Sequence, residues 1–196
     1  MQIFFPQKLN QGKKHYHKIT VACYLTKIGV HQERGRLLSK FADLVDRHTE
    51  ELAALDGADA GKLLLVGKVI DVPSATQMLR YYAGAADKIH GEVLRVSGKY
   101  QGYSLREPVG VAGVIIPWNF PTMMFFLKVS PALAAGCTVV VKPAEQTPLS
   151  ALYYAHLAKL AGVPDGVINV VPGFGHTAGA AITSHMDVDT VSIAYR

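Results

Sequence analysis

Three short polar clusters, each directly after an apolar run, hold the side chains that could do chemistry. The first contains Asn119, whose amide could donate a hydrogen bond to a developing oxyanion. The second places a cation, Lys142, three residues before a carboxylate, Glu145, a pair suited to binding the hydroxyls of a ribose. The third is the glycine-rich turn from Gly173 to Gly179, where backbone can approach a ligand and open a helix whose N-terminus favours anions. Together they predict a nucleotide cleft.

Each cluster also has a structural explanation when it is taken alone. The glycine spacing is G-x-G-x-x-x-G and not the dinucleotide fingerprint, and such a turn is more often structural. A lysine and a glutamate at a strand end are commonly a solvated edge, and a Trp-Asn pair after a strand is commonly packing. The nucleotide interpretation depends on the three clusters meeting, because ligands of open parallel sheets bind at the carboxyl ends of the strands.

Alternating segments beyond Pro108 would position these clusters. The pattern predicts strands over 110–116, 138–141 and 167–171, helices over 121–135 and 149–161, and a fourth strand from Val188. Near-continuous Val and Ile runs are typical of parallel strands buried on both faces, and their alternation with helices indicates right-handed βαβ units. The predicted fold class is therefore α/β, a partial open parallel, Rossmann-like sheet with flanking helices on both faces.

Helices and a hairpin are predicted before this alternation. Apolar residues at three- and four-residue spacings predict an amphipathic helix from Glu33 to Leu55. A second helix is predicted from an N-cap at Ser74 to Gly91. Residues 92–106 alternate between apolar and polar on either side of Ser97-Gly98, which predicts two short strands joined by a turn.

Composition and charge narrow the class of protein. The chain has 196 residues, of which 49% are hydrophobic and 18% charged, as expected of about one globular domain. No apolar run reaches the roughly 18 residues of a membrane-spanning helix. The net charge of +5 resides in residues 1–32, which contain five lysines and no acidic residue. We expect this segment to be a loosely ordered extension, and its sparse aromatic residues argue against a nucleic-acid partner.

Targeting signals and cysteines indicate a compartment. Residues 1–32 lack the unbroken apolar core of a secretory signal, and they lack the Arg and Ser residues of a transit peptide. Two cysteines far apart, Cys23 and Cys137, cannot form the disulfide framework of a small secreted domain. We therefore expect a cytoplasmic protein, with the mitochondrion as the alternative, and no metal site is predicted.

Four segments resemble the NAD-binding half of an aldehyde dehydrogenase. They read IPWNFP at 116–121, PALAAGC at 131–137, VKPAEQTP at 141–148 and GVPDGVINVV at 162–171. The resemblance covers about residues 33–193 and is nearest to the retinal- and acetaldehyde-oxidising branch, with a plant-like wording. It implies that 33–196 is an incomplete NAD-binding domain without the catalytic domain, and that 1–32 is a basic extension unlike the family. Residues 93–107 would then be the strands of an oligomerisation hairpin.

The resemblance also implies roles for the polar clusters. Ile116 to Asn119 would line the nicotinamide side of the cleft, Lys142 and Glu145 would hold the adenosine ribose, and Gly175 would lie beside the adenine. Glu145 would favour NAD over NADP, because its carboxylate repels a phosphate on the ribose. Asn119 would be the catalytic oxyanion stabiliser. The predicted cofactor-binding residues are Ile116, Pro117, Trp118, Asn119, Lys142, Pro143, Ala144, Glu145, Gly175 and His176, the last of which replaces a usual proline.

The implied function is oxidation of an aldehyde to a carboxylic acid with NAD. That reaction needs a cysteine nucleophile and a glutamate base, and the family carries both in segments beyond Arg196. Cys137 is expected to be an inert buried side chain and no substitute nucleophile. The chain by itself is therefore predicted to be inactive. The alternative is a non-catalytic subunit or interaction module that pairs with full-length aldehyde dehydrogenase subunits as a homo- or hetero-oligomer, with no nucleic-acid or membrane partner.

Overall fold

A four-stranded parallel sheet is the centre of the computed structural model, which describes residues 2–7, 15–20, 31–98 and 100–194. Its strands are β5 (Val111–Ile115), β6 (Thr138–Lys142), β7 (Ile168–Val170) and β8 (Thr190–Ile193). They lie in the order β7-β6-β5-β8, and every neighbouring pair is parallel. The chain thus builds outward from β5 in one direction and then crosses to its other side. This confirms the predicted Rossmann-like sheet and places a topological switch point beside β5.

Two helices cover one face of the sheet, α5 (Pro121–Ala135) and α6 (Leu149–Ala161), and both match their predicted ranges. Each ends at a glycine with positive φ, Gly136 at 90° and Gly162 at 94°, so the residue type that tolerates this backbone stops the helix where it must turn. The core between helices and sheet is apolar and aromatic, with Phe126 fully buried.

The other face carries a shorter helical segment, η2 (Gly175–Gly179), which continues into α7 (Ala180–Ser184). Fully buried Ile182 packs there in a second, smaller apolar cluster with Val111 and Val140. A Cβ at Gly113 would approach Ile182 Cγ2 to 2.5 Å, so the glycine permits this close approach of helix and sheet. The prediction that helices cover both faces is confirmed.

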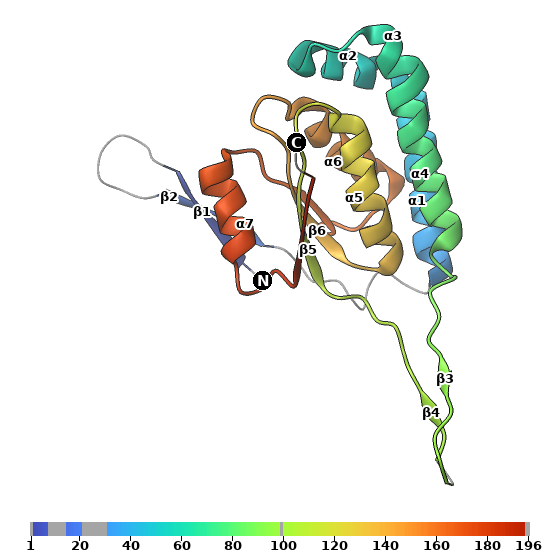
Figure 1. Ribbon diagram of the computed structural model, residues 1–196. Coiled ribbons are helices and arrows are strands. Elements are labelled where there is room, and N and C mark those ends of the chain that lie inside the picture. Colours follow the sequence, from blue (N-terminus) through green and yellow to red (C-terminus); the bar gives the residue numbers. More distant parts are fainter. Residues whose placement is uncertain (1, 8–14, 21–30, 99, 195–196) are drawn as a thin grey trace.

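The N-terminal helices differ from the prediction in their boundaries. The predicted helix over 33–55 is two helices, α1 (His31–Arg47) and α2 (Thr49–Ala60), which break at His48 with φ −102° and ψ 25°. The break turns α2 across the ends of α5 and α6 while α1 runs along them (Figure 1). The helical spacing of apolar residues continues through His48. The position of the break is therefore set by tertiary packing and not by this spacing.

The second predicted helix begins earlier and ends sooner than expected. Helical backbone starts at α3 (Leu64–Val66), passes through the π-helical η1 (Gly67–Asp71) and continues as α4 (Val72–Ala85). Ser74 therefore lies inside helical backbone, and the prediction that it caps the N-terminus is wrong. Pro73 is the second residue of α4 and comes directly after the π-helical segment.

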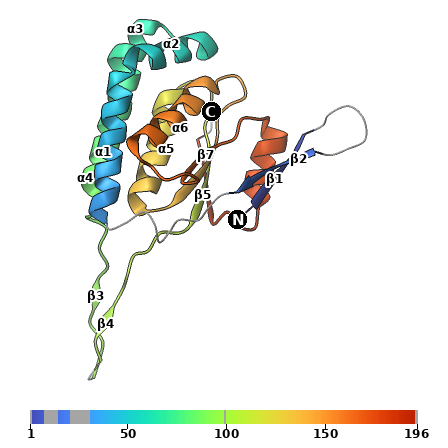
Figure 2. The same cartoon turned by 180° about the vertical axis from the view of Figure 1, so that it is seen from behind.

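A hairpin projects away from the body of the molecule (Figures 1 and 2). Its strands, β3 (Val93–Leu94) and β4 (Gly102–Tyr103), pair antiparallel, and Gly98 in the connection has φ +86°. The predicted pair of short strands over 92–106 is confirmed.

Two further strands, β1 (Gln2–Gln7) and β2 (His15–Thr20), pair antiparallel near the N-terminus, and β1 contacts η2. The prediction of a loosely ordered extension is wrong for these two segments, whose aromatic and β-branched residues favour strands. Cys23 lies outside the described residues. In the part of the chain that the structure describes, no helix is long and apolar enough to cross a membrane.

Candidate functional site

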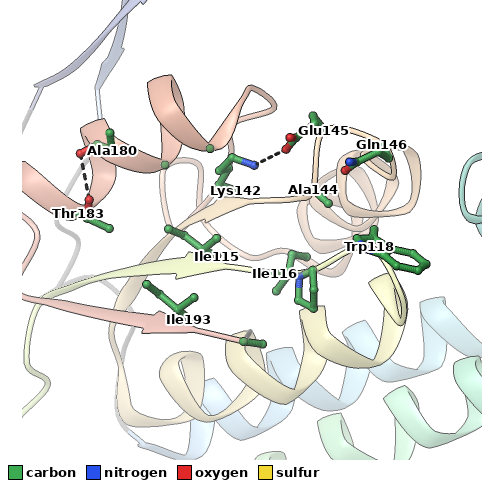
Figure 3. A pocket seen from close by; sticks show the side chains of 14 residues that line it. Ile115, Ile116, Trp118, Lys142, Ala144, Glu145, Gln146, Ala180, Thr183 and Ile193 are labelled. Carbon is green, nitrogen blue, oxygen red and sulfur yellow. Dashed lines mark hydrogen bonds and ion pairs between the residues drawn. The ribbon is translucent and has the colours of Figure 1, made fainter. Parts of the chain in front are cut away.

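An open cleft of about 460 Å³ lies at the carboxyl ends of β5, β6 and β8, beside η2 and α7 (Figure 3). It brings together residues from all three polar clusters of the sequence. Of the predicted residues, it is lined by Ile116, Pro117, Trp118, Lys142, Ala144, Glu145 and Gly175. Residues far apart in the chain, from Ile115 to Ala194, therefore meet at the carboxyl ends of the strands, as the strand-end argument requires.

The charged pair of the cleft is an ion pair. Lys142 is only 2% exposed, and its Nζ donates to the Pro143 carbonyl at 2.8 Å and to Glu145 Oε2 at 3.2 Å. An ammonium carries three protons, so one donor remains beyond these two bonds. The aliphatic stem of Lys142 packs near Gly179, where a Cβ would lie 3.5 Å from Lys142 Cδ. The lysine is thus held in place with its charged end directed at the cleft.

Glu145 is a partly exposed carboxylate that stays ionised. Its own backbone N–H, and then the Lys142 ammonium, hold the pKa of the Glu145 carboxyl below its usual value, against the opposing effect of burial. An ionised carboxylate only accepts hydrogen bonds. The pair therefore presents acceptors and a donor together, which is the combination that vicinal hydroxyl groups need.

The glycine-rich turn forms the rim of the cleft. A Cβ at Gly175 would meet no heavy atom within 4 Å, so the space beside it is open to a ligand. The Phe174 and His176 rings flank Gly175 and stack with centroids 5.6 Å apart and planes 17° apart. Both rings are exposed, and neither lines the cleft itself.

Asn119 and Pro143 also lie outside the lining residues. Asn119 is half-buried between the end of β5 and the start of α5, and no described residue bonds its buried Oδ1. The backbone carbonyl of Pro143 accepts a hydrogen bond from the Lys142 ammonium. The binding roles of all ten predicted residues, whether they line the cleft or not, stay predictions.

Sequence reasoning missed half of the lining. The missed residues are Ile115, Gln146, Gly179, Ala180, Thr183, Ile193 and Ala194. Applying the strand-end rule to the fourth strand would have found Ile193 and Ala194. Helical spacing would have found Gly179 and Thr183, which are four residues apart and share a face. The Thr183 hydroxyl donates to the Ala180 carbonyl at 3.1 Å (Figure 3).

Cys137 lies at the opposite edge of the sheet from the cleft. It immediately precedes β6, whose other end is Lys142, and five residues of strand span about 16 Å. Its thiol is free and the residue is 4% exposed. This placement agrees with a packing role and leaves the cleft without a cysteine among its lining residues.

Comparison with known proteins gives a consistent family. Residues 29–194 match the "Aldehyde dehydrogenase family". The chain is 64% identical over 161 residues to "Aldehyde dehydrogenase family 2 member C4" of Arabidopsis thaliana, an alignment that covers 82% of this chain and 32% of the relative. It is 57% identical over 160 residues to "Aldehyde dehydrogenase 1A1" of Gallus gallus, with 82% and 31% covered.

A solved structure shares the fold. The NAD+ complex of an aldehyde dehydrogenase from Bacillus cereus superimposes with a TM-score of 0.82 at 52% identity, covering 84% of this chain and 34% of that one. The chain thus spans about a third of the length of the relatives that it matches.

Proposed function

Because the chain belongs to the aldehyde dehydrogenase family, we propose that its cleft binds NAD and that it serves as the nucleotide-binding part of an enzyme that oxidises an aldehyde to a carboxylic acid. The observation that carries this proposal is the Lys142–Glu145 ion pair, 3.2 Å long, at the carboxyl edge of a parallel sheet. The neighbouring solved structure named above is itself an NAD+ complex, which supports the choice of ligand.

The residues of the cleft fit such a dinucleotide. Glu145 would accept from the ribose hydroxyls, and the remaining donor of Lys142 would bind a ribose oxygen. The open space beside Gly175 would take the adenine, and Ile116 to Trp118 would line the nicotinamide side. When bound, NAD supplies a hydride acceptor. Asn119 would donate its amide to the oxygen of the aldehyde as that oxygen gains negative charge.

Calorimetric titration of the purified chain with NAD tests this assignment. We expect saturable one-site binding that weakens at least tenfold in Glu145→Gln, because the amide replaces an acceptor with a donor and leaves Lys142 without its counter-charge. Asp165→Asn is the matched control, since this exposed carboxylate pairs with Lys159 away from the cleft. Equal affinity in Glu145→Gln would refute the ribose role of the ion pair.

We also propose that these 196 residues by themselves do not oxidise aldehydes. The family's chemistry needs a thiolate beside the nicotinamide, and Cys137 is buried at the far edge of the sheet. We expect no aldehyde-dependent NADH absorbance at 340 nm from the purified chain. NADH formation that is lost in Asn119→Ala would contradict this.

A second candidate function is favoured by the exposed hairpin. Val93 and Tyr103 lie directly opposite one another on β3 and β4 and are 87% and 70% exposed. Such an apolar pair is typical of an interface. The chain would then act as a non-catalytic module that pairs through its hairpin with aldehyde dehydrogenase subunits, either copies of itself or full-length ones.

The cytoplasm is the compartment that we propose, with the mitochondrion as the alternative. The support is the cysteine usage and the composition of residues 1–32. Microscopy of a fluorescent fusion with a mitochondrial marker separates the two locations.

A further inference from the structure

His176 places an ionisable ring at the adenosine end of the cleft. It follows Gly175, which lines the cleft, and its ring stacks on Phe174 at 5.6 Å with a 17° interplanar angle. Stacking favours this orientation of the imidazole, and the residue is exposed to ligand or solvent. The imidazole of His176 therefore lies stacked on Phe174 at the rim of the cleft.

Among the residues that the structure describes, the cleft itself has few charged side chains. Lys142 and Glu145 are the ionisable side chains among the residues that line the cleft. The sequences of η2, GHTAG, and of α7, AAITS, contain no other ionisable side chain, and neither does that of β1, QIFFPQ, the strand that contacts η2. The strand β2, which pairs with β1, contains His15, His17 and Lys18. Within the cleft, the charge of His176 acts on Glu145, because Coulombic attraction to His176 is one of the causes that lower the pKa of Glu145.

This arrangement changes the charge that a ribose phosphate would meet. With neutral His176, the positive charge of Lys142 and the negative charge of Glu145 cancel, and the carboxylate repels a phosphate on the ribose. With protonated His176, the three groups sum to one positive charge.

We propose that His176 is a specificity-determining residue which, when protonated, lets this cleft accept the 2′-phosphorylated dinucleotide NADP beside NAD. The inference rests on the proposed nucleotide function of the same cleft and adds a second ligand to it. The imidazolium would pair with the 2′-phosphate and offset its repulsion by Glu145. NAD lacks this phosphate, so its affinity would depend little on the charge of His176.

Calorimetric titration with NAD and with NADP at pH 6.0 and pH 8.0 tests the proposal. The measured quantity is the Kd for NADP divided by the Kd for NAD. Between pH 8.0 and pH 6.0 this ratio should fall in the natural chain, and the fall should be about fivefold larger than in His176→Gln. The factor corresponds to the roughly 1 kcal/mol that an exposed charge pair contributes. The 2′-phosphate itself titrates near pH 6, and the comparison with the variant cancels that effect.

Two further variants sharpen the test. His176→Lys carries a permanent charge, so its preference for NAD over NADP should be reduced at both pH values. His90→Gln, in an exposed segment between α4 and β3, should retain the pH dependence of the natural chain. If NAD binds and the pH response is identical in the natural chain and in His176→Gln, only the role of His176 is overturned. If NAD binds and NADP does not bind at either pH, the inference about His176 is overturned alone. If neither dinucleotide binds at millimolar concentration, the proposed function is overturned and this inference with it.

Discussion

The buried ammonium of Lys142 is stabilised by hydrogen bonds. An ammonium that is 2% exposed needs hydrogen-bond acceptors, and the Pro143 carbonyl and Glu145 supply two. Because both lie within three residues of Lys142, the loop after β6 satisfies the charge locally. The ion pair is thus a property of one short segment, and this is why the sequence already predicted it.

Removing the lysine should raise the pKa of Glu145. In the folded chain this pKa is lowered, so the stability that the carboxylate contributes is present above its unfolded pKa and lost as pH falls through its folded pKa. Lys142→Met removes the cation, and the stability lost on acidification should therefore shrink. Carboxyl chemical shifts followed by NMR between pH 2 and 6 measure the change. Lys159→Met, on the exposed pair with Asp165, is the control; an unaltered Glu145 titration in Lys142→Met would count against the ion pair.

At the scale of the elements, a buried polar chain joins α2, α5 and α6. Thr122 Oγ1 donates to Asp56 Oδ2 at 2.5 Å, so its single proton is used and the Tyr154 hydroxyl must donate to Thr122 at 2.7 Å. All three residues are at most 1% exposed. Burial raises the pKa of Asp56 and also that of Tyr154. These hydrogen bonds hold Thr122, which lies near the start of α5 and three residues after Asn119.

The pH dependence of stability should reveal Asp56. Because its folded pKa is raised, its contribution is fully present below the unfolded pKa and is lost as pH rises through the folded value. Asp56→Asn keeps an acceptor for Thr122 and does not titrate. Urea denaturation should therefore show the natural chain losing stability relative to Asp56→Asn as pH rises from 4 to 8.

Two control variants test whether the pH dependence comes from Asp56. Asp56→Ala removes the acceptor and should cost about 1–3 kcal/mol at any pH, since it leaves a buried donor unpaired. The exposed Asp165→Asn should not reproduce the pH trend. Parallel pH curves for the natural chain and Asp56→Asn would show that Asp56 titrates alike in the folded and unfolded chains.

Helix termination offers a second prediction at the scale of the elements. Gly136 ends α5 with φ 90°, and a Cβ there would lie 3.0 Å from Pro108 Cγ. Gly136→Ala should lower the free energy of unfolding by about 1–2 kcal/mol, because an L-residue is strained in this conformation. Gly84→Ala is the control, since Gly84 lies within α4 and a Cβ there meets nothing within 4 Å. It should raise stability by about 0.5–1 kcal/mol in the same urea titration, and a loss of similar size at both positions would contradict the assignment.

The whole molecule places the cleft where the strand order changes direction. β6 and β8 lie on either side of β5, and residues at the carboxyl ends of all three strands line the cleft. Two apolar clusters, one on each face of the sheet, hold this frame. The hairpin projects away from the body of the molecule (Figure 2). Its large apolar side chains are exposed.

Self-association should therefore depend on the hairpin and not on the body. We expect Val93→Thr combined with Tyr103→Thr to shift the chain toward smaller species in size-exclusion chromatography with light scattering, because the change removes an opposed apolar pair. Met186→Thr is the matched control, an apolar residue that is 95% exposed after α7. The same species distribution in all three chains would argue against the hairpin as an interface.

Local signals in the sequence determined the family, the parallel α/β class, the ranges of α5 and α6 and the Lys142–Glu145 pair. Each of these is encoded within a few residues, by the period of the apolar positions, by a terminating glycine such as Gly136, or by a short motif. Half of the cleft lining could be named for the same reason, since it directly follows predicted strands.

Only the tertiary structure decided what depends on contacts between distant residues. The break at His48 and the helical start before Ser74 follow from how α2 and α4 pack. The first turn of α6 has no local side-chain cap, and Asp59 of α2 accepts the Leu149 N–H instead at 2.9 Å, across 90 residues of chain. Strand order likewise brings Ile193 and Thr183 to the cleft. Sequence periodicity reports which face of an element is buried, but the partner that buries it is set by the free energy of the whole packed core.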